Sequence, residues 1–109
     1  MAFDEVLAQH VRALLAGTAG LSEKKSLGTL SFLVNGNMGV GLHGGELIVR
    51  IDPTANAGAL QQPGVRIFVS TGQPLKGWLL VGGSALAQRK ALAKWVKLGL
   101  DFASSLPAK

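Results

Sequence analysis

The side chains that most often perform chemistry are few and scattered in this sequence. It has two histidines, His10 and His43, six acidic residues and no cysteine. A hydroxyl nucleophile needs a base beside it, and neither histidine stands in a motif that would supply one. The histidines lack the spacing of a metal site, and the carboxylates are dispersed. We therefore expect no catalytic residue, no metal and no cofactor, and a protein that is not an enzyme.

One segment matches a nucleotide-binding motif letter by letter. Residues 39–44 read Gly-Val-Gly-Leu-His-Gly, which fits G-x-G-x-x-G. That motif binds a pyrophosphate only where it joins a strand to the N-terminus of a helix. Strand-forming residues stand on both sides here, so these glycines are expected inside a β-hairpin. Gly82-Gly83-Ser84 is better placed for an anion, but the cap of a following helix is the simpler interpretation.

Basic residues are the second source of candidates. The chain has eleven Lys and Arg against six Asp and Glu, a formal charge of +5, which permits a nucleic-acid partner without requiring one. Lys90, Lys94 and Lys97 recur at helical spacing and form either a ridge that contacts phosphates or the solvated face of an amphipathic helix. Lys76 and Trp78 flank a glycine, and this tryptophan is either an interface anchor or a core residue.

Hydrophobic spacing indicates the elements that carry these residues. Residues 3–16 have helical spacing, and His10 falls among the apolar positions, so it is expected to be packed. Asn35-Gly36 predicts a type I′ hairpin turn, whereas His43 is expected in an exposed turn. Gly39 and Gly41 leave one strand face without side chains, as if another segment packs against it. The predicted strands are residues 30–34, 37–42, 46–51, 65–70 and 78–81, with a loop over residues 71–77.

Two further helices complete the prediction. Asp52-Pro53 begins a short helix that runs to about residue 61. The last helix spans residues 85–106 with Ser84 as N-cap, and Gly99 within its apolar face lets it lie close to the sheet. The expected fold is α+β in the order α-β-β-β-α-β-β-α, a five-stranded antiparallel sheet with helices packed mainly on one face. A chain of this length forms one domain, residues 1–109.

Composition also bears on the compartment. Residues 26–45 carry no charge and are numerous enough to span a bilayer, but six of them are glycine, so no membrane span is expected. Acidic residues stand where a signal peptide needs basic ones, and a cytoplasmic protein is therefore expected. The positive mean hydropathy suggests apolar surface that a partner covers, so the protein is expected to be a monomer or a homodimer.

Several segments resemble one known family. They are Glu23-Lys24-Lys25, Leu33-Val34-Asn35-Gly36-Asn37-Met38, Leu47-Ile48-Val49-Arg50 with Pro53, Gly72-Gln73-Pro74-Leu75-Lys76-Gly77-Trp78, Trp95-Val96 and Leu106-Pro107. In this order they resemble the N-terminal domain of the TfoX/Sxy family. The resemblance implies an α+β domain of bacterial competence regulators, which act on transcription with the cyclic-AMP receptor protein rather than by catalysis. The chain differs where many members have Met-Phe-Gly-Gly, which is Ser26-Leu27-Gly28-Thr29 here, and it has Gly39-Val40 where many carry cysteine.

The first hypothesis is therefore a non-enzymatic interaction module in transcriptional regulation, whose partner is another protein such as a transcription factor or a polymerase component. Its contact residues are expected to be exposed positions that match the family pattern: Lys24, Lys25, Asn35, Asn37, Arg50, Lys76 and Trp78. One alternative is direct nucleic-acid binding through Lys90, Lys94 and Lys97. The other is a small-ligand site beside the sheet, at Gly39 and Gly41.

Overall fold

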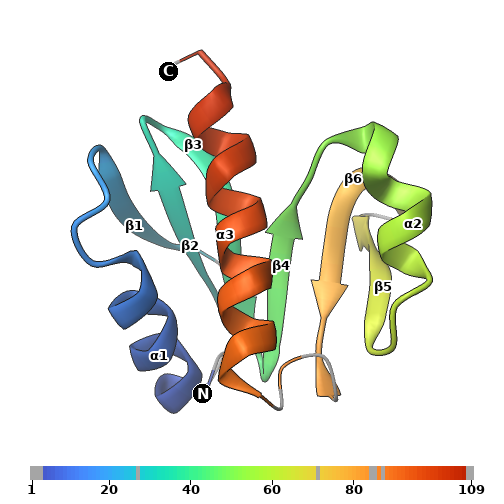
Figure 1. Ribbon diagram of the computed structural model, residues 1–109, viewed down its shortest axis with the longest axis horizontal. Helices are drawn as coiled ribbons and strands as arrows, with labels where there is room; N and C mark the ends of the chain where they lie inside the picture. The colour runs from blue at the N-terminus through green and yellow to red at the C-terminus, as the bar shows by residue number, and fades with distance from the viewer. Residues whose placement is uncertain (1–3, 27, 71, 84–85, 87, 108–109) are drawn as a thin grey trace.

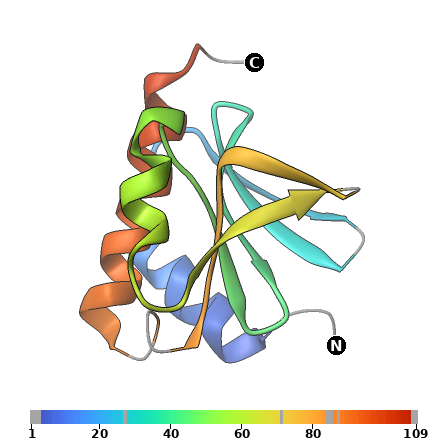
Figure 2. The same ribbon diagram turned by 90° about the vertical axis from the view of Figure 1, so that its right-hand side faces the viewer.

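The computed structural model describes residues 4–26, 28–70, 72–83, 86 and 88–107, and within these ranges it is an α+β fold with one six-stranded antiparallel sheet. The helices lie on one side of the sheet, and α3 crosses its middle (Figures 1 and 2). The elements in chain order are α1 (Glu5–Leu15), β1 (Leu21–Ser26), β2 (Thr29–Val34), β3 (Asn37–His43), β4 (Glu46–Arg50), the 3₁₀ turn η1 (Pro53–Ala55), α2 (Asn56–Leu60), β5 (Val65–Ser70), β6 (Gln73–Val81) and α3 (Arg89–Ser105).

Strands β1 to β4 form a meander in which each strand pairs with the next. The predicted hairpin turn is confirmed, because Asn35 and Gly36 have φ angles of 51° and 84°. The predicted number of five strands is wrong, because β1 precedes the three strands expected here. Its sequence, Leu-Ser-Glu-Lys-Lys-Ser, lacks the alternation of a half-buried strand. It is held as a strand by pairing with β2 along its whole length.

The second half of the sheet has the order β4-β6-β5, so β6 inserts between two strands that precede it in the chain. The loop predicted over residues 71–77 is too long, since β6 begins at Gln73. Its pairing with β5 is interrupted: Ile67 opposes Leu79, whereas Val69 opposes Pro74. The extra residues of β6 include Gly77, whose φ of 88° is rarely adopted by other residues.

Helix α3 lies close to the sheet at Gly99, as predicted, and the residue that it meets there is Gly39 of β3. A Cβ on Gly39 would come within 2.6 Å of the carbonyl oxygen of Gly99, and one on Gly99 would meet the carbonyl oxygen of Gly39. A bulge opposite Phe32 and Leu33 turns Gly39 toward the helix. A Cβ on Gly41 would instead meet Met38 and Leu30. The expectation that Gly39 and Gly41 both leave the same face of the strand open to another segment is therefore wrong.

Helix α1 turns a different face to the core than its spacing predicted. Asp4 is its N-cap and accepts hydrogen bonds from the backbone N–H groups of Val6 and Leu7. Its spacing predicted an apolar face that includes Val6, His10 and Leu14. The buried residues are instead Ala8, Val11 and Leu15, so the face is displaced. Arg12 bonds Glu23 of β1 through two guanidinium nitrogens, at 2.9 and 3.0 Å. This hydrogen bonding, with the charge of Glu23, raises the pKa of Arg12 above its ordinary value.

The core lies between the helices and the covered face of the sheet. Its buried members include Leu30, Phe32, Val40, Leu42, Leu47, Val49, Leu79, Val81, Leu92, Trp95 and Val96. Helix α3 begins at Arg89 rather than at residue 85, and its predicted N-cap, Ser84, lies outside the described residues. Across the described ranges, no helix combines the length and the apolar character needed to cross a membrane.

Candidate functional site

The guanidinium of Arg50, at the end of β4, lies between two aromatic rings. Its central carbon is 4.9 Å from the centroid of the Trp78 ring and 5.5 Å from that of Phe102. Trp78 is the residue opposite Arg50 on β6, and Phe102 comes from α3. Cation–π contacts of this kind stabilise a partly desolvated arginine by roughly 0.5–2 kcal/mol and restrict its orientation. The three side chains are half-buried, so part of this group reaches solvent.

Gly77 explains locally why Trp78 takes this position. The N–H of Ile51 donates a hydrogen bond of 2.8 Å to the Gly77 carbonyl oxygen, which continues the β4–β6 pairing beyond Arg50. A side chain at Gly77 would come within 3.0 Å of the Ile51 carbonyl oxygen and 3.2 Å of Pro53. The close approach and the positive φ both require glycine, and together they set Trp78 beside Arg50.

Two ion pairs are found among the described residues, Arg12–Glu23 and Arg66–Glu46, and neither involves Arg50. Stacking covers the flat faces of a guanidinium and leaves its N–H groups in the plane, where they bind carboxylates or phosphates in pairs. The N–H groups of Arg50 could therefore pair with an acidic group, and the described part of the chain does not supply one.

Phe102 also borders an open groove of about 660 Å³ between α3 and the η1–α2 segment. Its lining is formed by Ile51, Asp52, Thr54, Ala55, Gly58, Ala59, Gln62, Trp95, Leu98, Asp101 and Phe102. Ile51 and Trp95 are buried, whereas Leu98 is 41% exposed although it is a large apolar side chain. The groove thus offers apolar surface that begins at the ring on which Arg50 lies.

Asp52 holds the start of η1 at the rim of this groove. Its Oδ1 accepts hydrogen bonds from the backbone N–H and the hydroxyl of Thr54, at 2.9 and 2.8 Å. These bonds favour the carboxylate and hold the pKa of Asp52 below its ordinary value, the backbone bond contributing most. The predicted cap is confirmed, followed by a 3₁₀ turn and then α2.

Comparison with known proteins gives one result. The model of the TfoX N-terminal domain family matches residues 13–103. The chain belongs to this family. No curated protein and no solved structure matched it. The match runs from α1 to α3, so it includes both strands and the helix that surround Arg50.

The contact residues expected from the TfoX pattern do not form one surface. Lys24 and Lys25 lie on β1, and Asn35 lies in the β2–β3 turn. All three are exposed and lie toward the edge of the sheet that is farther from β6. Arg50 and Trp78 are brought together, and Lys76 is an exposed residue two positions before Trp78. Their proximity depends on the pairing of β4 with β6, which the sequence did not reveal.

Asn37 is not the exposed residue that we expected in this TfoX domain. It is 3% exposed, and its Nδ2 donates a hydrogen bond of 2.9 Å to the carbonyl oxygen of Pro107. A buried amide with a specific backbone partner holds the segment after α3 against β3. We therefore assign Asn37 a structural role and remove it from the contact surface.

The lysines of the alternative nucleic-acid surface are exposed on α3, as predicted for either interpretation. Lys94 turns toward neighbouring groups, since its Nζ lies 3.4 Å from Oε1 of Gln62 and 5.5 Å from the centroid of the Trp95 ring. Lys90 and Lys97 continue the exposed face on either side of it. The ridge is therefore present, with its central lysine directed toward the groove.

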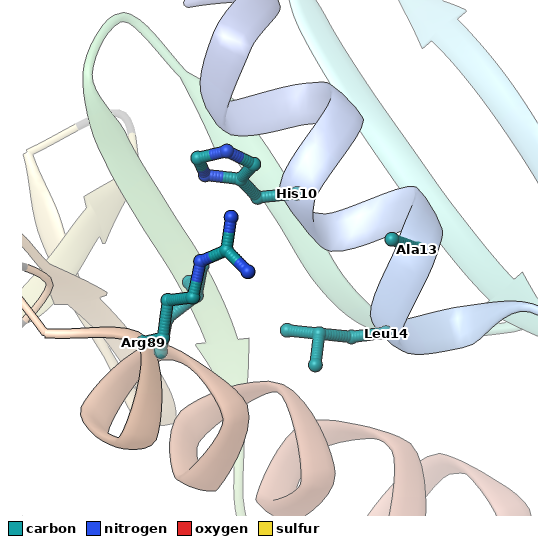
Figure 3. Close-up of a pocket in the computed structure, with 5 residues that line it drawn as sticks. His10, Ala13, Leu14 and Arg89 are labelled. Carbon is teal, nitrogen blue, oxygen red and sulfur yellow. The ribbon is translucent and has the colours of Figure 1, made fainter.

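The histidines lie apart from Arg50. His10 was expected to be packed but is exposed, because α1 buries a different face. It lines a small hollow of about 170 Å³ between α1 and α3, in which its ring and the Arg89 guanidinium lie near each other (Figure 3). His43 is exposed as predicted, and its Nδ1 lies 3.2 Å from the Thr29 hydroxyl. No group of three metal-binding side chains occurs in the described ranges.

The place proposed for a small ligand is filled. Gly99 and Ala103 of α3 cover Gly39, and the end of the Met38 side chain lies against Gly41. The G-x-G-x-x-G segment lies within β3 and the turn after it, as predicted.

Sequence reasoning missed Phe102 and Leu98 as site residues. The available signal was the position of Phe102 at the margin of the apolar face of the last helix.

Proposed function

We propose that this TfoX domain is a non-enzymatic, cytoplasmic interaction module in bacterial transcriptional regulation, similar to the competence regulators of its family. Its contact surface is formed by Arg50, Lys76 and Trp78 together with the adjoining groove. The observation that carries the proposal is the Arg50 guanidinium, which is held between Trp78 and Phe102 and has no carboxylate partner among the described residues.

The surface favours a protein segment that combines an acidic with an apolar side chain. The acidic group pairs with Arg50 and lies near the charge of Lys76. The apolar side chain enters the groove against Leu98 and Phe102, where burial contributes about 25 cal/mol per Å². Aromatic and arginine side chains at the centre of a contact commonly carry most of its free energy.

Arg50→Gln tests the proposal in affinity capture from a nuclease-treated lysate of the host. We expect the proteins retained by the parent domain to be lost, because the charge and the paired N–H donors are removed. Arg50→Lys should also retain few of these proteins, since an ammonium keeps the charge but not the planar contact with the rings. Arg89→Gln is the matched control, because Arg89 is exposed at the start of α3, away from Trp78.

The melting temperature of each variant distinguishes loss of binding from loss of folding. Arg50→Gln should melt within a few degrees of the parent, because only the cation–π contribution is lost. If Arg50→Gln folds and retains the same proteins as Arg89→Gln, this contact surface is wrong.

A second candidate function is direct nucleic-acid binding, favoured by the exposed ridge of Lys90, Lys94 and Lys97. It predicts DNA affinity that falls roughly tenfold or more between about 50 and 200 mM salt. Replacing the three lysines with glutamine should then abolish a gel shift that Arg50→Gln leaves intact. Absence of any shift at low salt would exclude this function.

A further inference from the structure

Strand β5 forms one edge of the sheet and is paired on one side by β6. In Figure 2 it crosses the front of the molecule, and no other element lies beyond it. An edge strand presents backbone N–H and C=O groups on its outer side, and these pair readily with another strand.

The side chains of β5 do not protect this edge. Its sequence is Val-Arg-Ile-Phe-Val-Ser, without the lysine or proline that usually blocks an edge. Val69, which follows the interruption in the pairing of β5 with β6, is 53% exposed. The single charge, on Arg66, is paired with Glu46 of the same chain. The edge is therefore apolar and close to neutral in a protein whose formal charge is +5.

The opposite edge differs in all these respects. Strand β1 carries Glu23, Lys24 and Lys25 in succession, all exposed. Charged side chains on an edge discourage further pairing. The two edges of one sheet thus have opposite properties, and β5 is the one that accepts a strand.

We infer that β5 pairs with β5 of a second copy of this chain, antiparallel across a two-fold axis, so that two sheets join into one. A strand that pairs antiparallel with itself meets the same apolar residues on both sides, so the contact is self-complementary and closed. The Arg66–Glu46 pair removes the repulsion that two free arginines would create near the axis. A nucleic acid would need positive charge that this edge lacks.

Sedimentation of the purified protein tests the inference. We expect the mass of a dimer at tens of micromolar, unchanged at high salt, because main-chain and apolar contacts are not screened. Val69→Lys should give a monomer. Val6→Lys is the matched control, since Val6 is 62% exposed on α1, and it should remain a dimer. A monomeric parent, or a dimeric Val69→Lys, would overturn the inference.

Hydrogen exchange of the unmodified protein gives a test that needs no variant. The amides of β5 should exchange about tenfold or more slowly in concentrated than in dilute solution, whereas those of β1 should not change. Equal behaviour of the two edges at both concentrations would also overturn the inference.

Discussion

At the scale of single residues, Arg50 and Asn37 show how context decides the role of a polar side chain. Both were selected because they match the TfoX pattern. Arg50 lies half-buried against two rings, and its N–H groups have no carboxylate partner among the residues that the structure describes. Asn37 is buried, and its amide is bonded to Pro107, seventy positions away. Residue types alone could not separate these roles, because the contacts that do so join distant parts of the chain.

Asn37→Ala should lower the free energy of unfolding by about 1–3 kcal/mol, because the Pro107 carbonyl oxygen loses its partner and a small void remains. Urea denaturation measures the change. Gln88→Ala, which removes an exposed amide that makes no capping bond, should change stability little. Equal effects of the two substitutions would show that the buried bond contributes nothing.

At the scale of elements, sequence prediction succeeded where the signal was local. The Asn35-Gly36 turn, the Asp52 cap and the face of α3 were predicted because each depends on neighbouring residues. Strand β1 was missed, since its polar sequence is held by pairing with β2. The face of α1 was displaced because packing in the core and against α3, rather than spacing alone, selects which residues are buried.

Gly99→Ala tests the close contact between α3 and β3. In a helix this substitution ordinarily stabilises by about 1 kcal/mol. Here the new Cβ would collide with the Gly39 backbone and the Val40 side chain, so we expect a net loss of about 1–3 kcal/mol. Gly58→Ala is the control, because a Cβ at this position in α2 meets nothing within 4 Å, and it should stabilise. Two changes of the same sign would contradict the contact.

Asp52→Asn tests the cap of η1 through pH. The folded-state pKa of Asp52 lies below its unfolded value, so its contribution to stability is complete above the unfolded pKa. It is lost as the pH falls through the folded pKa. The parent should therefore lose more stability than Asp52→Asn on acidification, because asparagine caps without titrating. Denaturation at several pH values measures the stability of both proteins. An equal loss of stability in the two proteins at acidic pH would refute this role of Asp52.

At the scale of the whole molecule, three surfaces lie apart: the groove among the helices, the β1 edge of the sheet and the β5 edge. The helices cover one face of the sheet, and the groove beside Phe102 lies among them. The edges of the sheet are unlike, with a charged β1 and an apolar β5. The family and the α+β class were predicted from the sequence, and the match over residues 13–103 confirms the family. The site was predicted only in part, because its residues meet through the β4–β6 pairing and the position of α3.

Photo-cross-linking in the host tests the contact surface most directly. A photoreactive residue at Leu98, 41% exposed in the groove, is compared with one at Leu14, 44% exposed on α1. We predict a nuclease-resistant protein adduct from position 98 that is absent from position 14 and disappears when Arg50→Gln is added. Adducts of equal yield from both positions, or an adduct from position 98 that survives Arg50→Gln, would contradict the account.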